Sequence, residues 1–248
     1  MAASVTAALL VIGDEILTGR TKDKNIGYIA EYLTGIGIDL REVRIVPDVE
    51  EEIVGAVNAL RQRYTYLFTT GGIGPTHDDI TADCIAKAFG VGIDHDPRAV
   101  AMLRERYQPD ELNEARLRMA RIPDGADLIE NPISRAPGFR LGNVFVMAGV
   151  PSIMQAMLDN ISPTLQTGAR MIAETIDAEG LAEGNYAEGL AAVASSHEGV
   201  SIGSYPSFSA GGFRNQIVVR GKDPAAVANA TLAVNDLLRR LKGDRAPL

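Results

Sequence analysis

The chain has 248 residues, which is enough for one large core or for a larger and a smaller domain. Apolar residues make up 46% and charged residues 23%, a composition that excludes disordered and collagen-like proteins. The formal net charge is −8, so the surface as a whole repels nucleic acids. An anion site in such a chain has to be built from backbone amides.

The scarcity of cysteine and the absence of long apolar segments indicate the cellular compartment. Cys84 is the single cysteine, which excludes a disulfide framework and a thiolate zinc site and fits a reducing compartment. Residues 1–8 have no basic segment or long apolar run, and no apolar stretch reaches 18 residues. We therefore expect a cytoplasmic protein with no membrane partner.

Three strand–loop–helix units open the chain. The first strand is predicted by a short apolar run that ends at Gly13, and in each unit the strand is followed by apolar residues three and four positions apart, which predict a helix. The expected strands are residues 6–12, 38–46 and 66–70. Asp48 and Glu51 form the capping-box pattern of the second helix. Repeated units of this kind predict an α/β fold with a doubly wound, mostly parallel sheet.

The next stretch is less regular. Residues 91–95 predict a short strand, and Asp96 followed by proline is typical of a helix N-terminus. Prolines break any long element between residues 123 and 139, and an apolar run then predicts a strand at residues 144–147.

Gly168 is the expected domain boundary, because the pattern changes after it from alternating strand–helix units to strand, helix, two strands and helix. The two late strands are expected to form an antiparallel hairpin. We predict a larger domain at residues 1–168 and a smaller α+β domain at residues 169–248.

The strongest candidate site is the glycine loop, residues 70–79, at the carboxyl end of the third strand, where doubly wound sheets bind their ligands. Its glycines allow close backbone approach to a phosphate, which successive amides bind without lysine. A glycine-rich turn without a ligand is the alternative. Neither the P-loop nor the Gly-x-Gly-x-x-Gly pattern is present, which argues against a purine nucleotide triphosphatase and a nicotinamide dehydrogenase. The expected ligand contacts in the loop are Thr70, Gly71, Gly72, Gly74 and Thr76.

Acidic residues accompany this loop. Asp78 and Asp79 follow the glycines, and a carboxylate beside a bound phosphate requires a divalent metal such as magnesium. His77 would also admit cobalt or nickel. Asp14 lies at the end of the first strand, so we expect Asp78, Asp79 and Asp14 to bind the metal. The alternative is that Asp78 or Asp79 caps the next helix.

Other strand ends add further candidates. Asp48 is either a helix cap or a residue of the site, and Ser152 is either a cap or a phosphate ligand. The remaining expected binding residues are Gly13, Asp14, Glu15, Gly149, Pro151 and Ser152.

In this order the motifs resemble the molybdopterin-binding (MoaB/Mog-like) domain family, in the version found at the N-terminus of the competence/damage-inducible protein CinA and in eukaryotic FAD synthase. The motifs concerned are residues 13–17, 25, 46–48, 70–81, 136–139 and 149–152. The resemblance implies a phosphorylated pterin or nucleotide as ligand, molybdopterin among them, catalytic roles for Asp79 and Asp48 beside Asp78, and a homodimer or homotrimer. Met119 and the pair Ser134-Arg135 depart from the family pattern, which affects ligand selectivity.

Residues 171–248 resemble the small middle domain of CinA, and with the chain ending at Leu248 we expect no deamidase domain after it. The middle domain has been likened to a KH fold, which raises RNA binding as an alternative. These residues carry two Lys and five Arg against nine Asp plus Glu, and no Gly-x-x-Gly segment. We therefore expect no nucleic-acid partner.

Three functions remain open. The first is a divalent-metal-dependent pyrophosphatase for ADP-ribose or a related dinucleotide such as FAD, as the resemblance implies. The second is binding or adenylylation of molybdopterin in molybdenum cofactor biosynthesis. The third is a ligand-binding module without turnover.

Overall fold

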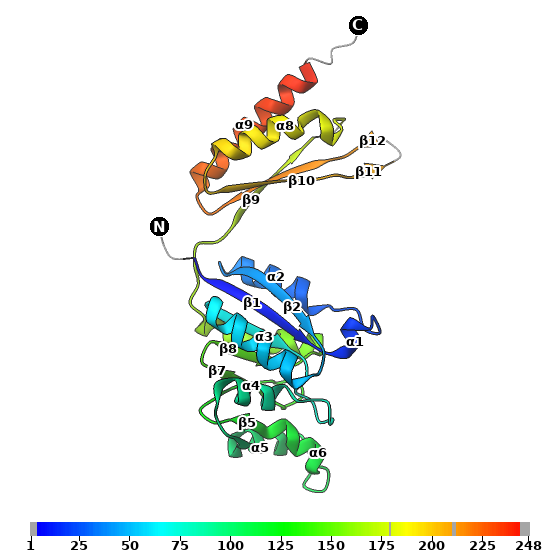
Figure 1. Ribbon diagram of the computed structural model, residues 1–248, viewed down its shortest axis with the longest axis vertical. Helices are drawn as coiled ribbons and strands as arrows, with labels where there is room; N and C mark the ends of the chain where they lie inside the picture. Colours follow the sequence, from blue (N-terminus) through cyan, green and yellow to red (C-terminus); the bar gives the residue numbers. More distant parts are fainter. Residues whose placement is uncertain (1–3, 179, 210–211, 244–248) are drawn as a thin grey trace. The chain divides into compact units, whose positions relative to one another are not determined.

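The computed structural model describes residues 4–178, 180–209 and 212–243. The chain divides into two compact units, Met1–Gly168 and Ala169–Leu248, here called the larger and the smaller unit (Figure 1). Each unit buries its own hydrophobic residues. Within the described ranges, no helix combines the length and apolarity needed to span a bilayer.

The larger unit is built on a six-stranded sheet with the order β2-β1-β3-β8-β7-β6. Strand β1 (Thr6–Ile12) pairs in parallel with β2 (Asp39–Val46) and β3 (Tyr66–Thr70), and β3 pairs in parallel with β8 (Val144–Met147). Strands β3 and β8 are buried along their whole length, as expected for a sheet covered on both faces. The predicted doubly wound, mostly parallel sheet is confirmed.

The sequence did not predict the antiparallel extension of this sheet. Strand β7 (Gly138–Leu141) pairs antiparallel with β8, and β6 (Asp127–Ile129) pairs antiparallel with β7. Strands β4 (Ile93–His95) and β5 (Arg121–Pro123) form a separate antiparallel ribbon. Strand β4 lies within the strand predicted at residues 91–95. Strands β5, β6 and β7 were not predicted, because they have only three or four residues and the prolines and glycines around them hide any period-2 pattern.

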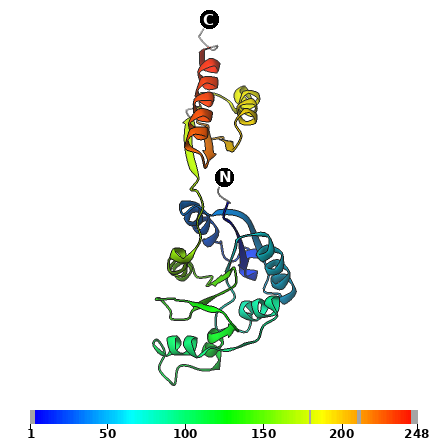
Figure 2. The same cartoon turned by 90° about the vertical axis from the view of Figure 1, so that its left-hand side faces the viewer.

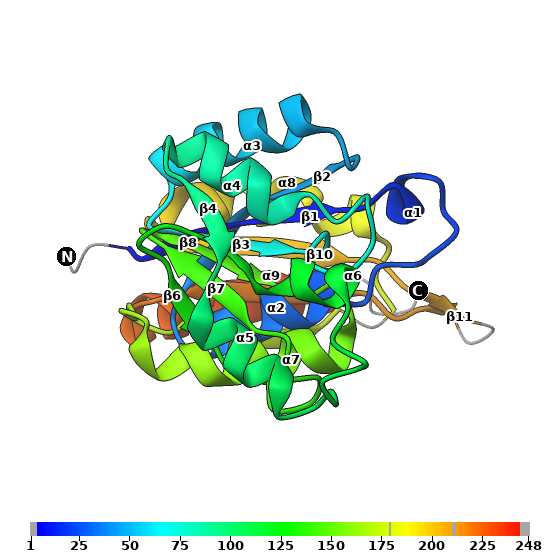
Figure 3. The same ribbon diagram turned by 90° about the horizontal axis from the view of Figure 1, so that it is seen from below.

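Helices cover both faces of the larger sheet (Figure 3). Helices α3 (Glu50–Arg63) and α4 (Thr81–Phe89) pack on one face, and α2 (Asn25–Gly35) and α7 (Pro151–Ile161) pack on the other. Successive residues of β1 point to opposite cores, so Leu9 contributes to one and Leu10 to the other. The shorter helices are α1 (Asp14–Leu17), α5 (Pro97–Arg104), α6 (Glu114–Leu117), η1 (Arg118–Ala120) and η2 (Ser162–Thr164).

Two expected helix caps are absent. Asp48 does not cap α3, which is preceded by Val49 and has no side-chain cap, because the Asp48 carboxylate accepts a hydrogen bond from the amide of Asp14 instead. Ser152 does not cap α7 either, since that helix already begins at Pro151 and Ser152 lies inside its first turn. By contrast, Asp96 caps α5 as predicted, accepting a hydrogen bond from the Arg98 amide at 2.7 Å.

The smaller unit has the predicted α+β architecture. Its sheet has the antiparallel order β10-β13-β9, formed by β9 (Ile172–Asp177), β10 (Val200–Tyr205) and β13 (Gln216–Gly221). The predicted hairpin is the β10–β13 pair, and β11 (Phe208–Ser209) and β12 (Gly212–Phe213) pair between them. Helices α8 (Glu183–Ser196) and α9 (Pro224–Gly243) pack on one face of this sheet (Figure 2).

Candidate functional site

A groove of about 520 Å³ lies at the carboxyl edge of the parallel sheet. Its walls come from the loops that follow β1, β3 and β8, because the carboxyl ends of parallel strands meet at one edge. Seven of the candidate binding residues line it: Glu15, Gly71, Gly72, Gly74, Asp79, Gly149 and Pro151.

The other candidates lie around this groove. Thr70 is buried and lines a neighbouring cavity of about 210 Å³, which shares Glu15, Gly149 and Pro151 with the groove. Six candidates line neither space: Gly13, Asp14, Asp48, Thr76, Asp78 and Ser152. The side chains of Asp14, Asp78 and Ser152 are exposed at the surface.

The backbone amides of Gly72, Ile73 and Gly74 have no hydrogen-bond acceptor in the described part of the chain, and all three residues line the groove. The amides on either side of them are occupied. Gly71 N donates to the Met147 carbonyl at 3.2 Å, and Thr76 N donates to Asp79 Oδ2 at 2.9 Å. A partly buried amide without an acceptor is unfavourable, so three in succession favour an anion as their partner.

Packing against the protein itself also requires the glycines. Gly71 and Gly72 have φ of 103° and 66°, and an added Cβ would lie 2.1 Å from the Ile12 carbonyl oxygen and 2.2 Å from Thr81 Oγ1, respectively. The Thr81 hydroxyl donates to the Gly71 carbonyl at 3.0 Å. The loop is therefore held against β1 and the start of α4 without a ligand, and the amides are already in position to bind one.

Asp79 holds the glycine loop from its other end. Its Oδ2 accepts hydrogen bonds from the amide and the hydroxyl of Thr76, at 2.9 and 2.5 Å. Neither Asp78 nor Asp79 caps α4, whose N-cap residue is Ile80 and which has no side-chain cap. The second carboxylate oxygen of Asp79, Oδ1, accepts no hydrogen bond from the described residues, and the residue faces the groove.

A second group of carboxylates surrounds Asp48. Partial burial raises the pKa of Asp48, the hydrogen bond from the Asp14 amide opposes this, and repulsion from the carboxylates of Asp14, Glu15 and Asp78 adds to the rise. These acidic side chains therefore lie within electrostatic range of one another at the carboxyl edge of the sheet.

The described carboxylates around the groove do not form a complete metal site by themselves. Across the described residues, no three His, Cys, Asp or Glu side chains are gathered as a metal site. Magnesium at nucleotide sites is typically held by one or two carboxylates, with phosphate oxygens and water completing the shell. Asp79, beside three unpaired amides, fits a metal that arrives with a phosphate. The roles of Asp78, Asp14 and the exposed His77 in binding it stay predictions.

The wall formed by η1 and the segment between β6 and β7 was the part that the sequence located least well. It contributes Met119, Asn131 and Ser134 to the groove. Asn131 shapes the segment, because Oδ1 accepts hydrogen bonds from the Ile133 and Ser134 amides and Nδ2 donates to the Ala136 carbonyl. An asparagine followed by such turn residues is the available signal.

Of the departures from the family pattern, Met119 and Ser134 line the groove and Arg135 does not. The Arg135 guanidinium instead pairs with Glu105, with 3.3 Å between Nε and Oε2. A change of ligand selectivity would therefore act through Met119 and Ser134.

The fold and the groove define a doubly wound α/β protein with a groove at the carboxyl edge of its parallel sheet. Residues 8–167 match the family described as "Probable molybdopterin binding domain", and the chain belongs to that family. Residues 170–244 match the family "FAD synthase, middle domain". The family expected from the motifs is thus confirmed.

Individual relatives agree with this assignment. A protein of Aeropyrum pernix is 38% identical over 167 residues, which cover 64% of this chain and 62% of that one. A protein of Pyrobaculum calidifontis is 33% identical over 211 residues, covering 81% of this chain and 80% of its own length. The crystal structure of the protein CinA, with unknown function, from Thermoplasma acidophilum shares 34% identity at a TM-score of 0.62 and covers 65% of this chain and 99% of that chain. The match with the A. pernix relative spans less than two thirds of that protein.

Proposed function

We propose that the chain is a divalent-metal-dependent pyrophosphatase that cleaves the diphosphate bridge of ADP-ribose or a related dinucleotide. The observation that carries the proposal is the run of three amides without an acceptor in the described residues, those of Gly72 to Gly74, which line a groove of about 520 Å³ together with Asp79. A carboxylate repels a phosphate at this range unless a cation lies between them, so the pairing of amides and acid favours a metal-bound phosphate ligand.

In this proposal the residues of the site have separate roles. The loop amides bind and orient one phosphate, and Thr76 fixes the Asp79 carboxylate so that Oδ1 is available to a cation. A bound divalent cation supplies polarisation of the phosphoryl oxygen and activation of water. Asp78 and Asp14 are candidate further ligands of that cation.

Asp48 acts through the backbone in this proposal. Its carboxylate holds the amide of Asp14, the residue that precedes Glu15 in the groove wall. Asp48 is therefore a positioning residue for the loop after β1.

The apolar part of the groove lining suits a flat ring. Ile73, Met119, Ala136 and Ile153 line the groove, and apolar side chains of this kind contact the faces of a base, flavin or pterin. The match of residues 170–244 to the middle domain of FAD synthase adds FAD to ADP-ribose as a candidate substrate.

Binding or adenylylation of molybdopterin is the second candidate, and the family match of residues 8–167 favours it. The phosphate of the pterin would then occupy the same three amides.

The test is a substrate panel of ADP-ribose, FAD and NAD with magnesium, cobalt or nickel, in which release of AMP is measured for wild type and Asp79→Asn. We expect metal-dependent AMP release by wild type and release that is slower by about 100- to 1,000-fold by the variant. If wild type releases no AMP with any of these metals, the pyrophosphatase proposal is abandoned. Rescue of a molybdenum-cofactor-deficient host by the chain would then support the second candidate.

A further inference from the structure

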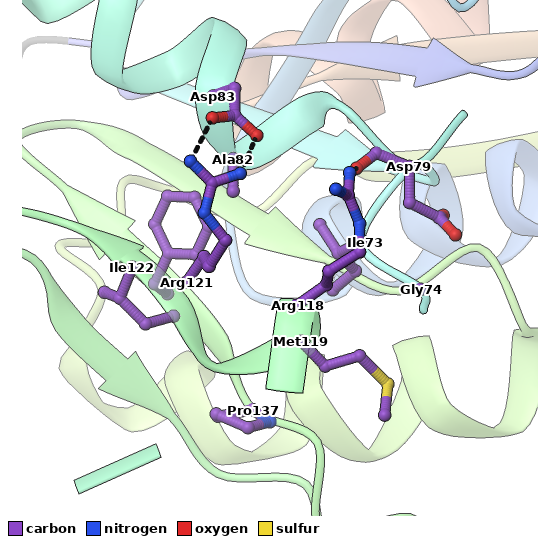
Figure 4. A pocket seen from close by; sticks show the side chains of 12 residues that line it. Ile73, Gly74, Asp79, Ala82, Asp83, Arg118, Met119, Arg121, Ile122 and Pro137 are labelled. Carbon is purple, nitrogen blue, oxygen red and sulfur yellow. Dashed lines mark hydrogen bonds and ion pairs between the residues drawn. The ribbon is translucent and has the colours of Figure 1, made fainter. Parts of the chain in front are cut away.

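A smaller cavity of about 20 Å³ adjoins the groove. The two spaces share the glycine loop residues 72–74 together with Asp79 and Met119. Two arginines, Arg118 of η1 and Arg121 of β5, also line the small cavity (Figure 4). Asp79 and Asp83 line it as well, so the recess holds two arginines and two aspartates beside the glycine loop.

The two arginines differ in what they contact. Arg121 is neutralised by Asp83, with Nη1 to Oδ2 and Nη2 to Oδ1 both at 2.7 Å. Arg118 has no carboxylate partner in the described ranges. Its guanidinium makes one hydrogen bond, from Nη2 to the backbone carbonyl of Asp79 at 3.4 Å, and its Nε is buried without an acceptor.

This arrangement is unfavourable for the protein alone. The Nε of Arg118 is a buried donor without an acceptor, and such a donor destabilises the fold. Figure 4 shows the guanidinium beside the backbone of Asp79, on the side where the glycine loop passes. An anion that reaches the recess from the groove would satisfy these donors.

The size of the recess limits that anion. A space of about 20 Å³ accommodates one water molecule or one ligand oxygen, and not a whole phosphate. The phosphorus must then lie in the groove, with one oxygen directed towards Arg118. The loop amides are assigned to a first phosphate in the proposed function. A second phosphate linked to the first could therefore direct one of its oxygens to Arg118.

We propose that Arg118 is a binding residue for the second phosphate of a diphosphate ligand, while the amides of Gly72 to Gly74 bind the first. This inference rests on the proposed function for the rest of the substrate, and it specifies the substrate class as diphosphate esters. A monophosphate, whether AMP or a phosphorylated pterin, would leave Arg118 unpaired. Arginine suits the task because its planar fork donates two parallel hydrogen bonds to one phosphate.

The test is isothermal titration of ADP, AMP and inorganic pyrophosphate into wild type, Arg118→Gln and Arg118→Lys, with and without magnesium. Arg118→Gln should lose affinity for ADP and pyrophosphate by about 10- to 100-fold and keep its affinity for AMP. The affinity of Arg118→Lys for ADP and pyrophosphate should lie between those of wild type and Arg118→Gln. Lysine keeps the positive charge but cannot donate two parallel hydrogen bonds to one phosphate. The control Arg104→Gln, at an exposed position of α5 with the same loss of charge, should match wild type.

Thermal unfolding of each variant shows whether it is folded. If Arg118→Gln does not fold, the affinity comparison is made with Arg118→Lys. Unchanged ADP affinity in either folded variant, or a wild type that binds ADP no better than AMP, overturns the inference. If the inference about Arg118 is overturned but wild type cleaves ADP-ribose, the pyrophosphatase proposal is retained without a role for Arg118. If pyrophosphate binds through Arg118 but no dinucleotide is cleaved, the inference stands and the proposed function fails.

Discussion

The backbone amide of Asp14 donates a hydrogen bond to the carboxylate of Asp48, with 3.0 Å between N and Oδ2, and so ties the loop after β1 to the loop after β2. Burial and neighbouring carboxylates raise the pKa of Asp48 against the effect of this hydrogen bond. The folded protein therefore holds this proton more tightly than the unfolded chain does. The resulting stability is full below the unfolded pKa of about 3.9 and is lost as the pH rises through the raised folded pKa.

Asp48→Asn should remove that pH dependence, because an asparagine Oδ1 still accepts from the Asp14 amide but carries no charge. We expect the Tm of the variant, relative to wild type, to rise between about pH 4 and pH 7. Thermal unfolding across this range measures the difference, with Asp110→Asn at an exposed position as control. A difference in Tm that is the same at every pH would show that ionisation of Asp48 carries no cost in the fold.

Asp79→Asn should bind nucleotide but not turn it over. The amide keeps an acceptor for Thr76 and removes the negative charge that a cation needs, so kcat should fall on the order of 100- to 1,000-fold. In metal-free buffer the variant should bind AMP at least as tightly as wild type, because a repulsive charge is gone. Thr76→Val separates the two roles of Asp79, since it removes one loop-holding hydrogen bond and keeps the charge. If kcat falls equally in Thr76→Val and Asp79→Asn, Asp79 acts only by holding the glycine loop in place.

Gly72→Val should destabilise the larger unit, whatever its effect on ligands. The new Cβ would lie 2.2 Å from Thr81 Oγ1 at a φ of 66°, which a β-branched residue adopts only with strain. We expect a loss above about 2 kcal/mol in the free energy of unfolding by urea. Gly55→Ala is the matched control in an open position of α3 and should stabilise by about 0.5–1 kcal/mol. Lost ligand binding in Gly72→Val consequently cannot test the anion site by itself.

Cys84 should react with thiol reagents only after unfolding. It is fully buried in α4, and burial raises the pKa of its thiol to about 12, so the thiolate is scarce in the native protein at pH 8. Alkylation by iodoacetamide should therefore be slow in buffer and fast in urea. Fast labelling of the native protein would mean that α4 opens locally without global unfolding.

Residues 1–168 should fold without the rest of the chain. The buried side chains of the larger unit form two cores on either face of its own sheet, and those of the smaller unit form a third. Gly168 has to be kept, because its amide donates to the Gly37 carbonyl at 3.1 Å. Circular dichroism and thermal unfolding of the truncated protein should show one cooperative transition. A product that is recovered only as aggregate would contradict this expectation.

The sequence located most reliably the elements that burial dictates. Strands β1, β3 and β8 lie at the residues predicted for them, because each is a short, mostly apolar segment that is buried inside the sheet. The meeting of the loops after β1, β3 and β8 followed from the strand topology. Site features that depend on distant partners could not be predicted. The capping-box pattern at Asp48 gave no hint that its carboxylate faces Asp14, and nothing near Arg118 in the sequence indicates that its guanidinium lacks a carboxylate.

The pairing of β3 with β8 sets the order in which the protein can form during synthesis. Leu67 pairs with Val144, so this edge of β3 cannot form its native pairing until β8, which is translated much later, has been made. Until then one edge of a strand that is fully buried in the native sheet stays open, and an open edge of this kind favours pairing with another chain. The growing chain is therefore most vulnerable to aggregation while residues 71–143 are being made. Faster synthesis of this stretch would protect the nascent protein, and a pause within it would expose it.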